Sequence, residues 1–265
     1  MRTRSKRAEK RREKGRIKNG MKETKNQTKK IKVKKYGCIS STQEYAEKMK
    51  PYGEDVIITA DRQSGGKGTK GRSFSSEKGG VYLSVLRFYE NLPAKDAFLI
   101  MAGTCAAVCK TLEAGGLQPK IKWPNDVFVG GKKICGILTE NTFSGENVLC
   151  SLSGIGINVD NVLPDELDDI ATSVLRETGK KQSVKKWRER LIENLNFSLC
   201  DESKSEVFGE YEKRLGFIGE NVSVVTESGR FLARILGVDE TGRLRVLAGG
   251  EEKTYSAAEV TRLSL

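Results

Sequence analysis

A run of residues at 122–140, KWPNDVFVGGKKICGILTE, combines side chains and turn residues that could act on an anionic ligand. Asn125 and Asp126 precede a strand-like run, and Gly130-Gly131 then supplies a two-residue hairpin turn. A hairpin closed there brings both polar side chains back beside residues 133–136, which include Lys133. A carboxylate can hold Mg²⁺ near phosphates, and a lysine can neutralise phosphoryl or carboxyl oxygens. An ordinary hairpin with solvated lysines explains the spacing equally well.

The glycine-rich stretch 62–74, RQSGGKGTKGRSF, is the second candidate. Four glycines at 65–71 are interleaved with lysines and followed by an arginine, so backbone N–H groups and positive charges could surround a phosphate. The Walker A spacing G-x-x-x-x-G-K-[ST] is absent from it. Because the stretch lies between expected strands at 55–61 and 81–87, we interpret it as a ligand-binding loop, with a plain surface loop as the alternative.

The residue types that the chain lacks limit the reactions that it could catalyse. The chain has 0 histidines, which excludes Ser-His and Cys-His triads and His-ligated metal sites. The 6 cysteines lack paired metal-ligand spacings and resemble the free, buried thiols of a cytosolic protein. No apolar run is long enough for a membrane span or a signal peptide. We therefore expect a cytoplasmic protein without membrane contact, whose chemistry uses Lys, Arg, Asp, Glu, amides and the backbone.

The positive charge of the chain is concentrated at its start. Residues 1–35 hold 17 of the 47 Lys+Arg but 3 of the 35 Asp+Glu, so the remainder is close to neutral. Residues 1–30 have almost no large apolar side chains and are expected to be disordered. Such a tail could contact nucleic acid non-specifically, and a DNA- or RNA-binding regulator is the lowest-ranked functional hypothesis. A solvated extension, or a true start at Met21, explains it more simply.

Hydrophobic periodicity predicts the elements that position these stretches. Strands are expected at 31–38, 55–61, 81–87, 120–123 and 148–159, and helices at 96–113, 183–200 and 205–214. Ser41 and Glu44 have capping-box spacing, which predicts a helix that continues to about Lys50. From Gly219 onward, short strands at turn-marked intervals predict a small β-barrel.

KWPND followed by GKKICGIL, the glycine-rich loop and the stretch Gly-x-Gly-Ile-Asn at 154–158 together resemble the biotin–protein ligase family. The resemblance runs from about Lys35 to the C-terminus. It implies an α+β fold: a class II synthetase-like catalytic domain, with a mixed sheet and flanking helices, followed by an SH3-like barrel. The implied domains are a tail at 1–30, a catalytic domain at 31–216 and a barrel at 217–265. The tail is too short and too poor in apolar residues for the winged helix of some members, so we expect the monofunctional type.

The resemblance implies a two-step, ATP-dependent ligation with Mg²⁺. Biotin would be activated to biotinyl-5′-AMP and then transferred to a lysine of a biotin carboxyl carrier domain, in acetyl-CoA carboxylase or a related carboxylase. Specific DNA binding is not expected. The oligomeric state stays open, and a homodimer is compatible with the sequence.

The family's motifs carry over residue by residue. The implied biotin contacts are Ser41, Thr42, Gln63, Gly66, Lys67, Trp123, Lys133, Gly136 and Gly154. The implied ATP and adenylate contacts are Gly68, Thr69, Lys70, Gly71, Arg72, Asn125, Asp126 and Asn158. Lys133 and Arg72 are the implied catalytic cations, and Asp126 is the implied Mg²⁺ ligand.

Several positions depart from the family pattern. Gln43 replaces asparagine, Lys67 replaces an arginine, Thr69 stands where arginine is frequent, and Phe74 replaces tryptophan. A lysine gives a point charge where arginine gives a planar fork, so these changes bear on affinity for the intermediate. Lipoate ligases and octanoyltransferases, whose Arg-x-Ser-Gly-Gly signature is matched at 62–66, are the enzymatic alternative. Trp123-Pro124, the Gly-x-Gly-Ile-Asn stretch and the terminal barrel favour biotin.

Overall fold

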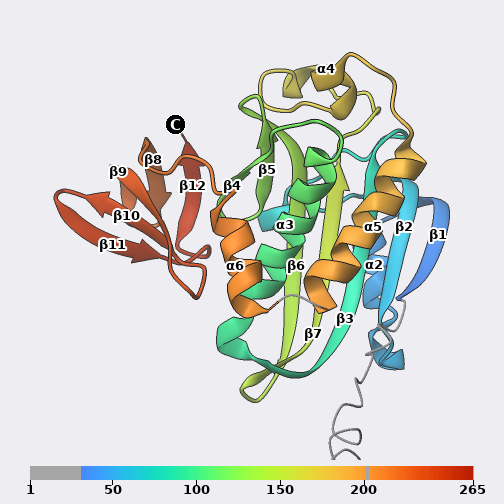
Figure 1. Ribbon diagram of the computed structural model, residues 1–265, viewed down its shortest axis with the longest axis horizontal. Helices are drawn as coiled ribbons and strands as arrows, with labels where there is room; N and C mark the ends of the chain where they lie inside the picture. The colour runs from blue at the N-terminus through green and yellow to red at the C-terminus, as the bar shows by residue number, and fades with distance from the viewer. Residues whose placement is uncertain (1–30, 201–202, 265) are drawn as a thin grey trace, which may run out of the picture. The chain divides into compact units, whose positions relative to one another are not determined.

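The computed structural model describes residues 31–200 and 203–264 of the 265-residue chain (Figure 1). The side chains of residues 70 and 196–200 are not described. The tail at 1–30, which the sequence predicts to be disordered, lies outside the described residues. Residues 31–265 form one compact unit. The division of that unit at residue 216 therefore stays a prediction.

A seven-stranded mixed sheet carries the first part of the described chain. Only β1 and β2 pair in parallel, and every other neighbouring pair in this sheet is antiparallel. In spatial order the strands are β1 (Lys32–Ile39), β2 (Val56–Gln63), β3 (Val81–Pro93), β7 (Asn147–Ile157), β6 (Lys132–Ser144), β5 (Asp126–Val129) and β4 (Lys120–Lys122).

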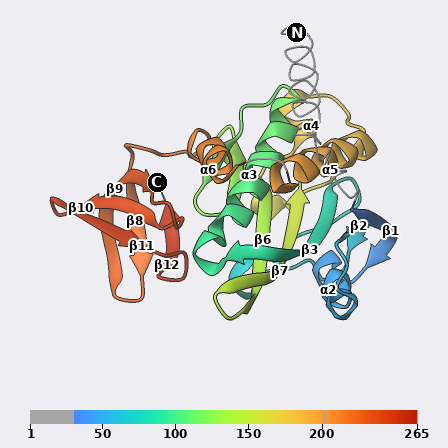
Figure 2. The same ribbon diagram turned by 60° about the horizontal axis from the view of Figure 1, so that its bottom comes forward.

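Helices cover the two faces of this sheet unequally. Two long helices, α3 (Phe98–Glu113) and α5 (Val184–Cys200), lie on one face, while the short α2 (Thr42–Glu47) lies on the other (Figure 2). The described chain also contains α4 (Val174–Thr178), α6 (Lys204–Glu212) and 3₁₀ turns at Lys50–Tyr52, Thr69–Gly71, Ala94–Asp96 and Asp165–Leu167.

Alternation along the central strands produces a separate apolar cluster on each face. Leu83 and Ile155 are paired residues that point towards α3 and α5 in the larger cluster. Leu86 and Leu152 are paired on the opposite face, in the smaller cluster that α2 covers. Because α2 spans only part of its face, the sheet stays open beside it, and that opening is where the candidate site lies.

A five-stranded, all-antiparallel sheet makes up the C-terminal part, named here the C-terminal β-domain (β8–β12). Its strands are ordered β11 (Glu251–Tyr255), β10 (Leu244–Ala248), β9 (Gly229–Val238), β8 (Asn221–Thr226) and β12 (Val260–Ser264). This confirms the predicted α+β class, with a mixed sheet followed by a small SH3-like β-domain.

Three local predictions need correction. Ser41 is the N-cap of α2 but makes no side-chain capping bond. Glu44, the other member of the predicted box, accepts a hydrogen bond from Ser40 and pairs with Lys67. The helix ends at Glu47 rather than near Lys50. β3 continues to Pro93, since its distal part pairs with the start of β7.

The described cysteines are free thiols, and most of them are buried, as the sequence predicted. Four cysteines (105, 109, 135 and 150) are buried free thiols, while Cys38 is free and exposed. No helix within the described ranges combines the length and apolar character needed to cross a membrane.

Candidate active site

Glycines on two neighbouring strands form the floor of a pocket. Gly136 of β6 pairs with Gly156 of β7, and Gly154 of β7 pairs with both Leu138 and Ser84. A methyl group at Gly154 would lie 2.5 Å from Oε1 of Gln43, so a side chain there would fill the space. Glycine inside a strand often marks close approach of a ligand to the backbone, and here it opens a trough on the α2 face.

One end of this trough is lined by buried hydroxyl and amide groups. The backbone N–H and the Oγ1 of Thr42 both donate to Oε1 of Gln63, at 2.7 and 3.0 Å. The Thr42 and Ser84 hydroxyls lie 2.8 Å apart, and Ser41 is buried beside them. This polar end can donate to and accept from a compact polar group while the surrounding strands exclude water.

Gln43 adds a second amide to the polar end, at a position absent from the predicted contacts. Its Oε1 accepts a bond from Ser84 Oγ at 3.2 Å, and its Nε2 donates to Glu140 at 2.9 Å. The side chain thereby spans from α2 to β6. Its only sequence signal was its place beside Ser41-Thr42.

The opposite end of the trough carries charge. The β5–β6 hairpin turns at Gly130 and Gly131, whose φ angles of 57° and 80° suit glycine. It places Lys133 Nζ 2.6 Å from Asp126 Oδ1, with both side chains partly exposed to the pocket. Asn125 donates to the Ile137 carbonyl at 2.5 Å. The predicted convergence of Asn125 and Asp126 with residues 133–136 is therefore confirmed.

A second lysine, Lys122, lies beside Asp126. Burial lowers the pKa of Lys122, the residue opposite Asp126 on β4. The nearby Asp126 opposes that shift, while Lys133 and Arg262 reinforce it. Two lysines beside one carboxylate leave a net positive charge, which suits a polyanionic group such as a triphosphate.

The glycine-rich loop folds as a narrow hairpin over the trough. Gly68 N–H donates to the Arg72 carbonyl at 2.7 Å, and Phe74 N–H donates to the Gly66 carbonyl at 2.8 Å. Lys67 reaches Glu44 of α2 at 3.0 Å, which ties the loop to the polar end.

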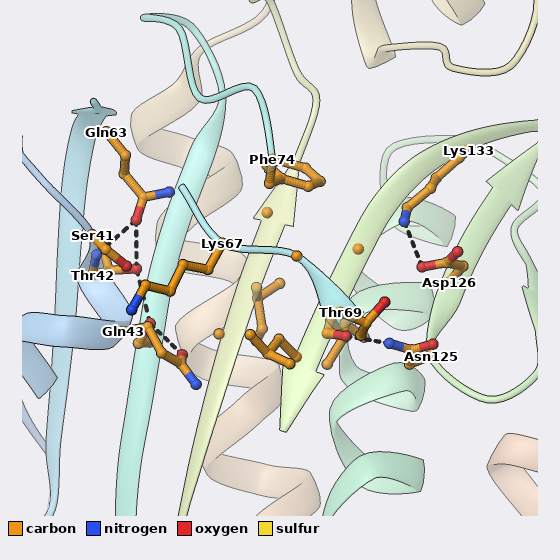
Figure 3. A pocket seen from close by; sticks show the side chains of 18 residues that line it. Ser41, Thr42, Gln43, Gln63, Lys67, Thr69, Phe74, Asn125, Asp126 and Lys133 are labelled. Atoms are coloured by element: carbon orange, nitrogen blue, oxygen red, sulfur yellow. Dashed lines mark hydrogen bonds and ion pairs between the residues drawn. The ribbon is translucent and has the colours of Figure 1, made fainter. Parts of the chain in front are cut away.

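Phe74 occupies the middle of the trough, between the polar and charged groups (Figure 3). Its ring lies against two of the floor glycines. A Cβ at Gly156 would come within 2.5 Å of the ring, and a Cβ at Gly136 within 3.2 Å. The free volume left in the pocket is about 40 Å³. Small-molecule sites typically measure about 300–1,000 Å³, so a ligand must displace this ring.

Most predicted site residues line this one pocket. They are Ser41, Thr42, Gln63, Lys67, Gly68, Thr69, Asn125, Asp126, Lys133, Gly136 and Gly154. Gly156 of the matched Gly-x-Gly-Ile-Asn stretch also lines the pocket. Sequence analysis assigned no contact to several other lining residues, namely Gln43, Phe74, Ser84, Ile137, Leu138 and Ile155. Ser84 carried one signal, since it is a small polar residue within the mostly apolar run 81–86.

Two other loop residues predicted to bind nucleotide, Gly71 and Arg72, do not line the pocket, unlike Gly68 and Thr69. Arg72 is exposed, and its guanidinium donates to the Thr69 carbonyl and hydroxyl at 3.3 and 3.1 Å. Gly71 is exposed beside it, and the Lys70 side chain lies outside the description. Gly66 is buried beneath Phe74 and Ser76 rather than lining the trough.

Two predicted contacts lie in the interior of the protein. Asn158 is buried and donates to the Thr172 carbonyl at 3.1 Å, so it fixes the segment after β7. Trp123 is 5% exposed, and its indole N–H donates to the Gly242 carbonyl in the C-terminal β-domain at 2.9 Å. Neither lines the pocket, because each side chain is used in internal packing.

The side chains of the pocket could bind a metal ion only if a substrate supplied most of the ligands. Among the described residues no group of three or more His, Cys, Asp or Glu could hold an ion. Asp126 is the single carboxylate among the residues that line the pocket. Mg²⁺ at phosphate sites is commonly held by one or two carboxylates plus the substrate's phosphates, so Asp126 fits a nucleotide-borne Mg²⁺.

Two parts of the chain match known protein families. Residues 36–158 match the biotin/lipoate A/B protein ligase family, and residues 217–262 match the biotin protein ligase C-terminal domain. The bifunctional ligase/repressor BirA of Bacillus subtilis is 34% identical over 235 residues, which cover 83% of this chain and 70% of that protein. A biotin–[acetyl-CoA-carboxylase] ligase of Mycobacterium tuberculosis is 27% identical over 218 residues, which cover 79% of this chain and 80% of that protein.

A solved structure resembles the fold over nearly the whole described chain. The biotin protein ligase of Aquifex aeolicus, in complex with biotin and ATP, superposes with a TM-score of 0.72 and 29% identity. The match covers 88% of this chain and 98% of that one. Together with the matched catalytic and C-terminal regions, these similarities show that the chain belongs to the biotin protein ligase family.

Proposed function

We propose that this protein activates biotin with ATP and transfers it to a lysine of a biotin carboxyl carrier domain. The observation that carries the proposal is the shape of the pocket. A hydrogen-bonding end and a cationic end lie on opposite sides of a glycine floor. Biotin has a ureido ring at one end and a carboxylate at the other, and the two ends of the trough match these groups in chemistry.

In the first step a biotin carboxylate oxygen attacks the α-phosphorus of ATP. The new O–P bond gives biotinyl-5′-AMP, and the bond to pyrophosphate breaks. Negative charge develops on phosphoryl oxygens, where Lys133 can stabilise it from its position beside Asp126. Asp126 is our candidate Mg²⁺ ligand, and Mg²⁺ would neutralise phosphate charge in this complex.

In the second step the acceptor lysine amine attacks the biotinyl carbonyl. An amide forms, AMP leaves with the bonding electron pair, and the amine proton passes to solvent. Lys133 can stabilise the carbonyl oxygen as its charge develops, and no side-chain nucleophile is needed. The names of the relatives support a carrier domain of acetyl-CoA carboxylase as the partner.

The polar end favours biotin over lipoate. Thr42, Gln63 and Ser84 offer hydroxyl and amide groups that a ureido ring can satisfy. A dithiolane ring offers only weak acceptors, so its binding would leave buried polar groups unpaired. Octanoate lacks polar head-group atoms altogether and would be disfavoured for the same reason.

ATP–pyrophosphate exchange, measured with biotin and with lipoate at equal concentration, tests the proposal. We expect exchange that depends on biotin, with lipoate supporting little. Exchange with lipoate alone would assign the protein to the lipoate branch. A folded protein that catalyses neither exchange would contradict the proposed activity.

A further inference from the structure

Trp123 connects the sequence segment that carries Asn125 and Asp126 to a distant part of the chain. Its indole N–H donates to the Gly242 carbonyl at 2.9 Å, across 119 positions of sequence. The ring is 5% exposed. A buried N–H that loses its partner is costly, so this bond holds Trp123 in register with the C-terminal β-domain.

The turn that presents the Gly242 carbonyl is internally fixed. Asp239 Oδ1 accepts bonds from the N–H and hydroxyl of Thr241, at 2.9 and 2.7 Å, and from the N–H of Arg243 at 2.9 Å. Gly242 has a φ of 82° and donates to the Asp239 carbonyl at 2.9 Å. We refer to residues 239–243 as the β9–β10 turn.

A second series of contacts connects the β9–β10 turn to the segment that carries Asn125 and Asp126. A Cβ at Gly242 would overlap the Phe98 ring, so this turn packs directly on the start of α3. Phe98 meets Tyr211 edge-to-face at 5.2 Å between ring centroids. The Tyr211 hydroxyl then donates to the Pro124 carbonyl at 3.0 Å. Both routes end on the two residues that precede Asn125-Asp126.

We propose that the β9–β10 turn positions the Trp123–Asp126 segment for nucleotide binding, with Trp123 and Gly242 as positioning residues. This inference rests on the proposed function, since it assigns the charged end of the pocket to ATP. Trp123 acts through Asn125 and Asp126, which line the pocket, and does not touch the ligand itself. A displacement of about 1 Å in such a segment can cost about a hundredfold in rate.

The two tryptophans of the protein provide a matched experiment. Trp187 is also 5% exposed and also donates its indole N–H to one acceptor, Oε1 of Gln182 at 3.1 Å. Trp123→Phe and Trp187→Phe therefore each remove one buried hydrogen bond and keep most of the ring. Both variants are compared with wild type by thermal unfolding and by biotin-dependent ATP–pyrophosphate exchange.

We expect similar losses of thermal stability from the two variants but different kinetics. Trp123→Phe should lower kcat/KM for ATP about ten- to a hundredfold and leave the KM for biotin within about twofold, whereas Trp187→Phe should change neither. Equal kinetic effects of the two variants would overturn the proposal. A Trp123→Phe variant with normal ATP kinetics would overturn it as well.

A milder variant keeps the test informative if Trp123→Phe does not fold. Asp239→Ala removes three bonds within the exposed turn and leaves the Trp123 indole in place. Its control is Glu252→Ala, which breaks an exposed pair with Arg245 at 2.7 Å elsewhere in the same β-domain. We expect a raised KM for ATP in Asp239→Ala alone, and equal values in both variants would contradict the inference. Absent exchange by the wild type would instead refute the proposed function.

Discussion

The β5–β6 hairpin and the glycine-rich loop both present cations near one pocket, but they hold them differently. Lys133 lies on a strand, its backbone bonded at 2.9 Å to both Ile170 and Thr172 and its Nζ paired with Asp126. Arg72 lies on the loop, exposed, with its guanidinium folded back on Thr69. The hairpin is held by strand pairing without a ligand, while we expect the loop to rearrange when a ligand binds.

This difference separates two tasks within the proposed reaction. Electrostatic stabilisation is effective when its donors are preorganised, which a strand provides. Enclosing an intermediate requires a segment that opens and closes, which a glycine-rich loop provides. The hairpin should therefore set the rate of adenylation, and the loop should set ligand entry and retention.

Lys133→Ala should give the largest effect. The variant removes the one cation that the structure holds 2.6 Å from Asp126. We expect exchange to fall about 10²–10³-fold, the cost typical of losing one preorganised stabilising group. The measurement is biotin-dependent ATP–pyrophosphate exchange by a folded variant.

The adjacent lysine serves as the control. Lys132 has its Nζ on the Asp168 carbonyl at 2.6 Å, away from the pocket, so Lys132→Ala should retain activity within about twofold. Near-normal exchange by Lys133→Ala, or equal losses in the two variants, would remove the assigned role of the hairpin.

Arg72→Ala should have a smaller effect that falls on retention. If the loop closes over the intermediate, Arg72 adds one charged hydrogen bond, a loss of about 1.5–3 kcal/mol or roughly ten- to a hundredfold in affinity. The expected result is faster release of biotinyl-5′-AMP, measured by trapping the free intermediate. An unchanged release rate would mean that Arg72 stays folded on Thr69 during turnover.

Phe74→Ala should accelerate biotin entry, since the ring fills the trough in the structure. Apparent affinity scales with the fraction of molecules whose site is open, so we expect association about three- to tenfold faster. Stopped-flow binding of biotin measures this rate directly. Slower association in the variant would show that Phe74 forms part of the site and does not occlude it.

The Lys67–Glu44 ion pair connects the glycine-rich loop to α2. Removing it should give the smallest effect, and this effect should depend on pH. The Ser40 hydroxyl and then Lys67 lower the pKa of Glu44 below its ordinary value of 4.5. Because the pKa of this carboxyl is lower in the folded than in the unfolded state, ionised Glu44 stabilises the folded state at pH values above the unfolded-state pKa. This stabilisation is lost as the pH falls through the folded-state pKa. The exposed pair is worth about 0.2–1 kcal/mol.

Amide exchange of the loop in wild type and Glu44→Gln, compared at each pH, isolates this contribution. The wild-type loop should be better protected at about pH 6, and the difference should vanish well below pH 4.5. A difference that persists at low pH would exclude ionised Glu44 as the tether.

Local patterns predicted the hairpin and not the interior contacts. Gly130-Gly131 between strand-like runs predicts the return of residues 133–136 to Asp126. The turn does not predict the bulge between Val127 and Phe128, which shifts the register by one residue and places Gly136 opposite Asp126. Trp123 could not be placed from its neighbours, since its acceptor lies 119 positions away. The same limit applies to Phe74, whose position depends on how two separate strands pair.

The capping box shows how tertiary contacts override a local signal. Ser41 and Glu44 have the correct spacing, but Glu44 is used by Ser40 and by Lys67 of the loop. At α6, Ser203 and Glu206 form the full capping box. Spacing alone does not distinguish these two sites.

The central claim is the complete ligation of biotin, and intact-mass analysis of an acceptor tests it most directly. Purified protein, Mg·ATP and a biotin carboxyl carrier domain are incubated with biotin or with lipoate as the only acid. The account predicts one biotinyl group on one carrier lysine, no addition when ATP is omitted, and little or none with lipoate. An unmodified carrier in the presence of biotin, or a lipoylated carrier in its place, would contradict it.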